Sequence, residues 1–524
     1  MTLEFTLNKA FTDKLTADPI SDNYCRQVHN AFYSYVKPEL FKNSKLIHVS
    51  KEMAETLDLS ADDCQSEEFL KIFSGQQAIT STEPYAMNYG GHQFGNWAGQ
   101  LGDGRAIILG DVISSDNQRW CLQLKGAGAT PYSRRGDGLA VLRSSVREFL
   151  CSEAMFHLGV PTTRALSLVT TGEEVMRDMF YDGNPAYEPG AIVCRAAPSF
   201  IRFGNFQLFH YRRETDALKL LLEYVLDEFG SHFEGDLKSR TLQWFAEVCH
   251  KTMLMVVEWM RVGYVHGVMN TDNMSIHGIT IDYGPYGWLE DYNPGWTPNT
   301  TDSSMRRYCF GEQPQIAQWN LCRLGEALNS VVDDIEALQN ILSAASHQFS
   351  TAWKDMMAQK LGLGNHKDGD QILFEKLNGV LQTSEIDMTL FYRELANWQP
   401  ERRSEDLVQD FESAIYNTDK FIEKSLNPLK IWLGLYAERL KDSEINNDLR
   451  SVSMNKVNPL YVLRNYIAQL AIDEAEKGDS TRIEETLEVL RNPYTLQIGR
   501  EEYSARRPEW ARNRAGCSML SCSS

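Results

Sequence analysis

The residues best suited to chemistry lie in the loop His266-Gly-Val-Met-Asn-Thr-Asp-Asn273, which is followed nine residues later by Asp282-Tyr-Gly284. Amide and carboxylate oxygens are the ligands that hard divalent cations prefer, so Asn273 and Asp282 are candidate metal ligands. Asp272 is the only carboxylate inside the loop and is a candidate general base for a hydroxyl within hydrogen-bond reach. The alternative for Asp272 is a structural role, in which it caps the loop in an Asx turn.

The order of these residues is similar to the catalytic loop of protein kinases, which reads His-x-Asp-x-x-x-x-Asn and precedes a separate Asp-x-Gly. At the position of the kinase base this chain has Val268. An aliphatic side chain can neither accept a proton nor orient a hydroxyl. The pattern therefore predicts a site that keeps its metal ligands and has altered its transfer chemistry.

Lys125 and Glu148 are the candidate ion pair of this site. Lys125 ends a predicted strand, and Glu148 follows 23 residues later on a predicted helix. In kinases such a pair holds the lysine ammonium against the nucleotide phosphates. A solvated surface pair is the alternative, but the later Asn273 and Asp282, in the kinase order, favour the functional interpretation.

Glycines and arginines in the first half of the chain are candidates for phosphate contacts. Glycine lets backbone N–H groups approach phosphate oxygens closely, and Gly102, Gly104 and Arg105 precede Lys125 by about twenty residues. Ordinary turns are the alternative for these glycines. Arg195 and Arg202 could form a fork over a polyphosphate, or could instead pair with some of the many carboxylates.

Hydrophobic periodicity predicts the elements that carry these residues. Residues 105–110 and 119–125 read as a β-hairpin, and residues 138–158 as a helix with Asp137 as N-cap and Gly159 as its stop. The first hundred residues read as short helical and irregular segments. Further strands are expected at 165–171 and 191–196, and helices at 215–229, 241–260, 372–381, 407–416, 429–440 and 461–477.

We therefore expect an α+β, two-lobed, protein-kinase-like fold with a mixed β-sheet N-lobe and a large helical C-lobe. The expected parts are an N-terminal extension packed on the lobes (1–95), the N-lobe (96–208), the C-lobe (209–500) and a C-terminal tail with a cysteine pair (501–524). The boundary near residue 208 is set by the change from strand-like to helical patterns.

Composition limits the possible partners. The formal charge of −19 argues against binding to nucleic acid or to an anionic membrane, since those surfaces are bound through accumulated Lys and Arg. No apolar run approaches the roughly 20 residues that span a bilayer, and the start of the chain has no signal-peptide pattern. We expect a cytoplasmic monomer.

The ten cysteines are interpreted in two groups. The internal ones have no zinc-ligand spacing and are expected to be buried, reduced thiols. Cys517 and Cys522 lie in a tail that reads as exposed and that contains four arginines, which would stabilise a thiolate. The hypothesis is that Cys522 forms a reversible disulfide with Cys517 or Cys309, and the alternative is a frayed terminus with inert thiols.

Several motifs of the chain are long and specific. They are Leu122-Gln-Leu-Lys-Gly-Ala-Gly128, Pro131-Tyr-Ser-Arg-Arg135, Val141-Leu-Arg-Ser-Ser-Val-Arg-Glu-Phe-Leu150, the loop 266–273 and Asp282-Tyr-Gly-Pro-Tyr-Gly287. Together they resemble the selenoprotein O family, including its bacterial cysteine-containing members. The resemblance runs from about residue 30 to the terminal Cys-Ser-Ser, and Cys522 stands close to the position of the family's selenocysteine.

This resemblance implies a pseudokinase that binds ATP in a flipped orientation and transfers AMP to Ser, Thr or Tyr hydroxyls of proteins, or another nucleotidyl group such as UMP. It implies Mg²⁺ or Mn²⁺ at Asn273 and Asp282, and Asp272 as the proton acceptor. An atypical kinase that transfers the γ-phosphate and a non-catalytic nucleotide-binding scaffold are the competing hypotheses. The implied nucleotide contacts are Gly102, Gly104, Arg105, Lys125 with Glu148, Asp137, Gly138, Arg195 and Arg202.

Overall fold

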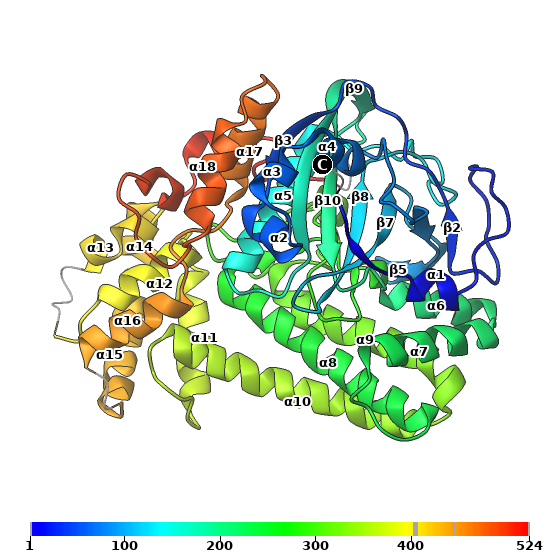
Figure 1. Ribbon diagram of the computed structural model, residues 1–524. Coiled ribbons are helices and arrows are strands. Elements are labelled where there is room, and N and C mark those ends of the chain that lie inside the picture. Colours follow the sequence, from blue (N-terminus) through cyan, green and yellow to red (C-terminus); the bar gives the residue numbers. More distant parts are fainter. Residues whose placement is uncertain (1–2, 402–406, 444–445, 522–524) are drawn as a thin grey trace.

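The computed structural model describes residues 3–401, 407–443 and 446–521. Its largest sheet is antiparallel throughout, with the strand order β2-β4-β7-β8-β10-β9-β3 and with β1 paired to β7 (Figure 1). The strands are β1 Thr6–Asn8, β2 Tyr33–Tyr35, β3 Lys45–Val49, β4 Tyr85–Met87, β7 Ala106–Ile113, β8 Arg119–Lys125, β9 Arg164–Arg177 and β10 Ala186–Ala197. Two small antiparallel pairs lie outside it, β5 Gly90–Gln93 with β6 Asn96–Gln100, and β11 Tyr264–Val265 with β12 Gly287–Trp288.

The predicted hairpin of residues 105–125 is confirmed. Strands β7 and β8 pair from Ala106 opposite Lys125 to Ile113 opposite Arg119, and the turn between them is polar. Both faces of this part of the sheet are covered, since successive residues of a strand point to opposite faces. Ile107 packs in the core with Phe69 and Phe73 of the N-terminal helices, and its neighbour Ile108 packs in the core that contains α5.

Helix α5 (Leu142–His157) matches the helix expected at 138–158, but Asp137 is not its N-cap. The N-cap residue is Val141, and the Asp137 carboxylate instead accepts hydrogen bonds from Arg177 and from the backbone N–H of Leu139. The prediction was wrong because the sequence does not show Arg177, forty residues away, which binds this carboxylate. The helix does end just before Gly159, as expected.

The first hundred residues hold more sheet than the sequence suggests. Besides α1 Ala10–Lys14, α2 Lys51–Thr56, α3 Ala61–Cys64 and α4 Glu67–Phe73, they contribute β1 to β4 to the main sheet. Three of these strands have three residues each, too few for an alternating pattern to be recognised. Pairing with strands far along the chain, such as β4 with β7, makes them strands.

The remainder is largely helical, as expected, and in Figure 1 the helices α7 to α10 lie beneath the sheet while α11 to α16 form a group beside it. The helix expected at 215–229 is α7, and those expected at 241–260, 372–381 and 429–440 lie within α8, α11 and α15. The helices are α6 Phe203–Arg212, α7 Thr215–Phe229, α8 Leu237–Val262, α9 Gln313–Val332, α10 Ile335–Lys360, α11 Asp370–Leu381, α12 Met388–Asn397, α13 Leu407–Asp410, α14 Thr418–Lys424, α15 Leu426–Lys441, α16 Asn447–Val457, α17 Asn465–Ala475 and α18 Thr481–Leu490.

Two helix predictions were wrong in their extent, and tertiary contacts explain both. The helix expected at 407–416 is only the short α13, because Ile415 pairs with Ile386 and the carbonyl of Ala414 accepts from Asp387. The helix expected at 461–477 begins at Asn465. The residues before it are not helical, and there the buried side chain of Arg464 binds the carboxylates of Glu290 and Asp387.

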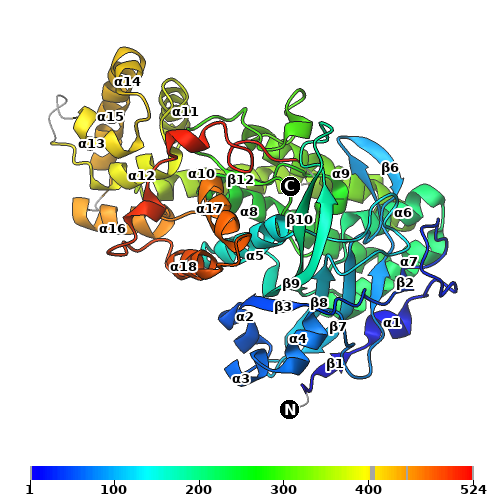
Figure 2. The same cartoon turned by 90° about the horizontal axis from the view of Figure 1, so that it is seen from above.

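The C-terminal helices return to the sheet. Helices α17 and α18 pack against α5, and Figure 2 shows them beside it. The tail then runs past the loop 298–300, where Leu520 exchanges backbone hydrogen bonds with Pro298 and Thr300. Asn299 in turn donates to the carbonyl of Gly267 at 3.0 Å, so the tail lies next to the predicted catalytic loop. No helix in the described ranges is long and apolar enough to cross a membrane.

The expectation of an exposed tail was wrong for Cys517, which is buried, and burial raises the pKa of its thiol to about 11. Arg514 acts in the opposite direction, but burial outweighs its attraction, and Arg514 also pairs with Asp473. Cys522 lies outside the described residues, so its disulfide stays a prediction. Most internal cysteines are buried as expected, but Cys25 is exposed and Cys322 half-buried.

Candidate active site

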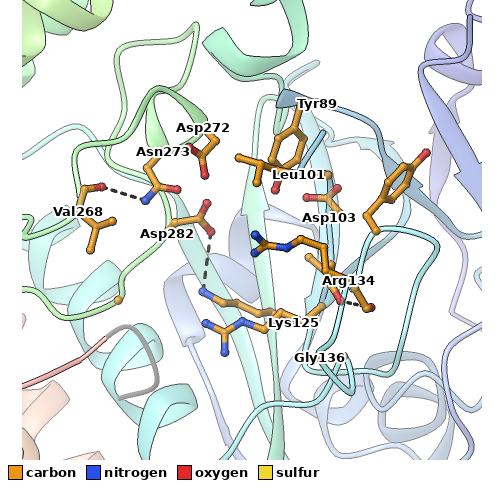
Figure 3. Close-up of a pocket in the computed structure, with 18 of the residues that line it drawn as sticks. Tyr89, Leu101, Asp103, Lys125, Arg134, Gly136, Val268, Asp272, Asn273 and Asp282 are labelled. Atoms are coloured by element: carbon orange, nitrogen blue, oxygen red, sulfur yellow. Dashed lines mark hydrogen bonds and ion pairs between the residues drawn. The ribbon is translucent and has the colours of Figure 1, made fainter. Parts of the chain in front are cut away.

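A cavity of about 730 Å³ lies between the start of β7, the end of β8 and the loop 266–285 (Figure 3). All the residues predicted for the site line it except Glu148, which contacts it through Lys125. These lining residues are Gly102, Gly104, Arg105, Lys125, Asp137, Gly138, Arg195, Arg202, Asp272, Asn273 and Asp282. The structure therefore brings together residues that are up to 180 positions apart.

Lys125 is the last residue of β8, and Glu148 lies on the buried face of α5. The Lys125 Nζ is 2.5 Å from Glu148 Oε2 and 3.8 Å from Asp282 Oδ1. Both Lys125 and Glu148 are almost fully buried, which excludes the solvated surface pair. Burial lowers the pKa of Lys125 to about 8, against the opposing attraction of Glu148, so the ammonium is still charged at neutral pH.

Asp282 is the residue on which the cations of the site converge. Its carboxylate accepts from Arg195 Nη1 at 2.5 Å, pairs with Arg202, and faces Lys125 (Figure 3). Burial alone would raise the pKa of Asp282, but the attraction of these three cations outweighs it and holds that pKa well below its usual range. Asp282 is therefore ionised at any physiological pH. It also has a left-handed backbone, with φ of 61°, an uncommon conformation that turns the chain at this point.

Arg195 and Arg202 hold carboxylates together in this structure, the alternative that the sequence left open. Besides Asp282, Arg195 binds Glu148 at 2.9 Å, and Arg202 donates to the backbone carbonyl of Asp272 at 2.8 Å. Both arginines nevertheless line the cavity. Each arginine can therefore pair with a carboxylate and also contact a bound anion, because a guanidinium group has five N–H donors.

Asp272 and Asn273 lie side by side in a short 3-10 turn of the catalytic-type loop, Thr271–Asn273. Asn273 Nδ2 donates to the Val268 carbonyl at 2.9 Å, which fixes the amide and directs its oxygen away from that bond. Val268 itself lines the cavity with an aliphatic side chain, as the sequence indicates. The position of the kinase base therefore carries no proton acceptor in this structure.

The Asp272 carboxylate has few partners. Oδ2 accepts from Gln93 Nε2 at 3.2 Å, and Oδ1 is buried without a hydrogen bond from any described residue. Burial raises the pKa of Asp272 to about 6, with the Gln93 hydrogen bond acting in the opposite direction. A carboxylate with this pKa is ionised at neutral pH yet basic enough to accept a proton. Among the described residues, the backbone N–H of Met274, which an Asx turn would use, does not donate to this side chain, so the Asx-turn alternative is not supported.

Strand β5 comes directly against Asp272, a contact that the sequence did not predict. A Cβ at Gly91 would lie 2.5 Å from Asp272 Oδ1, so only glycine fits there. The signal was present as the Gly-rich run Tyr89-Gly-Gly-His-Gln-Phe-Gly95, but nothing in the sequence connects it to a loop nearly 180 residues later. Gly102 is required for a different reason, since its φ is 73° and a Cβ would collide with the ring of Tyr132.

Further cations line the cavity that the sequence analysis did not assign to it. Arg134 and Arg135 are exposed at its rim, and Arg177 holds Asp137 there at 2.7 Å. The sequence could have indicated Arg134 and Arg135 as phosphate contacts, because two adjacent arginines lie there next to glycines. In total seven lining side chains are cationic and four are acidic, in a chain with net charge −19. The cations are Arg105, Lys125, Arg134, Arg135, Arg177, Arg195 and Arg202, and the acids are Asp103, Asp137, Asp272 and Asp282.

This local excess of positive charge suits a polyanion such as a nucleotide triphosphate. A divalent cation fits the same site, because Asn273 and Asp282 present amide and carboxylate oxygens to one side of the cavity (Figure 3). Another acidic cluster, Glu52 with Glu153 and His157, is less suitable. Arg491 and Arg164 already bind its carboxylates.

Comparison with known proteins agrees with this site. A family model described as protein adenylyltransferase SelO matches residues 21–491. A protein nucleotidyltransferase YdiU from Flavobacterium johnsoniae is 50% identical over 518 residues, which cover 99% of both chains. Proteins of the same name from Rhodopirellula baltica and an Azoarcus species are 52% and 53% identical, over 100% and 98% of both chains. The chain thus belongs to the SelO family of protein adenylyltransferases.

Proposed function

We propose that this protein transfers AMP from ATP to Ser, Thr or Tyr hydroxyls of other proteins, with Mg²⁺ or Mn²⁺ as the cofactor. The observation that carries the proposal is that a cationic cavity with candidate metal-ligating oxygens also contains a buried carboxylate with few hydrogen-bond partners. Asp272 has a pKa near 6 and lies beside Asn273, while the kinase base position holds Val268. Membership of the SelO family and the name of the YdiU relatives support the same reaction.

In the proposed mechanism the cavity binds the triphosphate through its cations. Lys125 contributes an ammonium fixed by Glu148, and Arg195 and Arg202 contribute guanidinium groups already held at Asp282. A divalent cation bound by Asn273 and Asp282 would neutralise charge on the phosphates. Because the carboxylate of Asp282 has about four acceptor sites, it can bind both a cation and the arginines.

Asp272 then acts as the general base. It accepts the proton of the incoming protein hydroxyl, whose oxygen attacks the α-phosphorus. The bond from that phosphorus to the β-phosphate bridging oxygen breaks, so AMP is joined to the protein and pyrophosphate leaves. Nothing has to reach Val268 for this step. The pseudokinase arrangement of two lobes and the flipped nucleotide belong to this proposal, as do the proposed domain boundaries, a monomeric state and a place in the cytoplasm.

The test asks which phosphate of ATP becomes attached to protein. The protein is incubated with a bacterial lysate and ATP labelled either at the α-phosphate or at the γ-phosphate. The proposal predicts protein-bound label from the α position alone, and Asp272→Asn removes it. Label from the γ position alone would indicate the kinase reaction instead, and absence of both with intact ATP binding would indicate a scaffold.

A further inference from the structure

The hairpin β5–β6 and the loop 302–308 form a surface next to Asp272 that the proposed chemistry does not use. Two contacts beyond Gln93 anchor the hairpin to the catalytic loop: the backbone N–H of His92 donates to Thr271 Oγ1 at 2.7 Å, and that of Phe94 donates to Asn270 Oδ1. The Phe94 N–H also donates to the hydroxyl of Tyr308 in the loop 302–308. Figure 1 shows β5 beside α6, which it contacts, and Figure 2 shows β6 near α6 and α9 at one side of the molecule. A hydroxyl that reaches Asp272 must pass near this hairpin.

Arg307 is held against the tip of that hairpin. A Cβ at Gly95 would lie 3.4 Å from the central carbon of the Arg307 guanidinium, which also lies 4.7 Å from the ring centre of Trp319 and 5.8 Å from that of Tyr308. The hydroxyl of Tyr308 donates to Asn270 Oδ1 at 2.6 Å. Packing against aromatic rings and a glycine positions this side chain before any partner arrives.

The Asp302 carboxylate attracts this arginine electrostatically, but the two side chains do not form an ion pair in the part of the chain that the structure describes. Among the residues that the structure describes, neither Arg307 nor the exposed Arg306 forms an ion pair with a carboxylate, and Arg307 Nε has no hydrogen-bond partner. The nearby Asp302 carboxylate accepts instead from the backbone N–H groups of Arg307 and Tyr308. By contrast, Arg323, which lies over the same Trp319 ring, pairs with Glu326 at 2.9 Å. Two adjacent arginines without an ion pair to any described carboxylate are unusual in a chain with net charge −19.

We propose that Arg307, which packs against the tip of the hairpin β5–β6, and the adjacent Arg306 of the loop 302–308 bind an acidic side chain of the protein acceptor close to the hydroxyl that is modified. This inference rests on the proposed function and names the partner as an acidic segment. A guanidinium fork matches a carboxylate. Gly95 is two residues from Gln93, so the guanidinium lies on the order of 10 Å from Asp272, and the acidic residue falls roughly two to four positions from the hydroxyl in an extended segment.

The experiment measures peptide binding directly. A short fluorescent peptide with one serine and two nearby glutamates is titrated with the full chain in the presence of ATP and Mg²⁺, beside a peptide with glutamines in place of the glutamates. Expected are tighter binding of the acidic peptide, a loss of about tenfold on Arg307→Ala, and a smaller loss on Arg307→Lys, which keeps the charge but not the fork. Arg323→Ala is the matched control, since it removes a paired arginine from the same ring and should leave binding unchanged.

A second arm reverses the charge. Arg307→Glu should bind a lysine-containing peptide better than the acidic one, while its affinity for a fluorescent ATP analogue stays that of the unaltered protein. Equal binding of the acidic and glutamine peptides, or an Arg307→Ala variant that binds the acidic peptide as well as the Arg323→Ala control, would overturn the inference. Transfer of α-phosphate label to the same peptides is recorded separately, and charge-selective binding without transfer counts against the proposed function alone.

Discussion

The two ends of the cavity differ in how their charged groups are satisfied. At the phosphate end, Asp282 and Glu148 are bound by Lys125, Arg195 and Arg202 in one buried network. At the hydroxyl end, the Asp272 carboxylate accepts one hydrogen bond from a side chain of the described residues, that of Gln93. Cations pull the pKa of Asp282 down while burial pushes that of Asp272 up to about 6. Carboxylates ten residues apart in the chain are thus suited to opposite tasks, binding positive charge and accepting a proton.

The largest effect is expected at the phosphate end. Asp282→Asn removes a proposed metal ligand and leaves Arg195 and Arg202 buried with fewer partners. We expect transfer to fall below detection and the free energy of unfolding to drop by about 3 to 5 kcal/mol, the cost typical of breaking a buried ion pair. Denaturant unfolding and labelled-ATP assays over a Mg²⁺ titration measure the two effects. A variant that is folded and turns over normally with metal would show that Asp282 binds no cation.

The hydroxyl end should behave differently. Asp272→Asn keeps the size of the side chain and removes the proton acceptor, so we expect transfer to fall by about 10² to 10⁴-fold with little change in ATP affinity or stability. Steady-state transfer and ATP binding are measured on the same preparation. If ATP affinity falls as strongly as transfer does, Asp272 also contributes to ATP binding. The phosphate end and the hydroxyl end of the cavity would then not have separate functions.

Within the phosphate end, Lys125→Ala removes a charge-assisted contact of about 1.5 to 3 kcal/mol, which corresponds to a loss of ATP affinity of roughly tenfold to a hundredfold. Calorimetric titration with ATP and Mg²⁺ measures this loss of ATP affinity. Glu153→Gln is the control, because it disrupts a buried ion pair on the same helix α5, with Arg164, outside the cavity. Equal losses in both variants would mean that α5 is disturbed in general.

The pKa of Asp272 determines how the rate of AMP transfer depends on pH. Because the base must be ionised, transfer should be at its plateau well above pH 6 and fall about tenfold for each pH unit below it. ATP binding should not follow this profile, since Asp282 stays ionised throughout. A profile of transfer that is flat between pH 5 and 7 would exclude a base with a pKa of about 6.

The smallest expected effect concerns Gln93, whose hydrogen bond lowers the pKa of Asp272. Gln93→Ala should shift the midpoint of the pH profile upward and leave the plateau rate within a fewfold of the original. A lowered plateau with an unchanged midpoint would instead indicate that Gln93 contacts the acceptor. Gln100→Ala, on the partner strand β6 and away from Asp272, serves as the control.

The sequence predicted the phosphate end better than the hydroxyl end, and the reason is physical. Lys125, Glu148, Asn273 and Asp282 lie on elements with strong local patterns and in an order that carries information. Gln93 and Gly91 meet Asp272 across nearly 180 residues, and no local pattern encodes that contact. Short strands such as β4 were missed for the same reason, since pairing with distant strands and not propensity makes them strands.

The measurement that tests the central claim most directly is the intact mass of an acceptor protein after reaction with ATP and Mg²⁺. An acceptor taken from the α-label experiment is purified and incubated with the unaltered protein and with Asp272→Asn. The account predicts a mass increase equal to one adenylyl group, abolished by the substitution. An increase equal to one phosphoryl group would contradict it, because the reacting phosphate next to Asp272 would then be γ and not α.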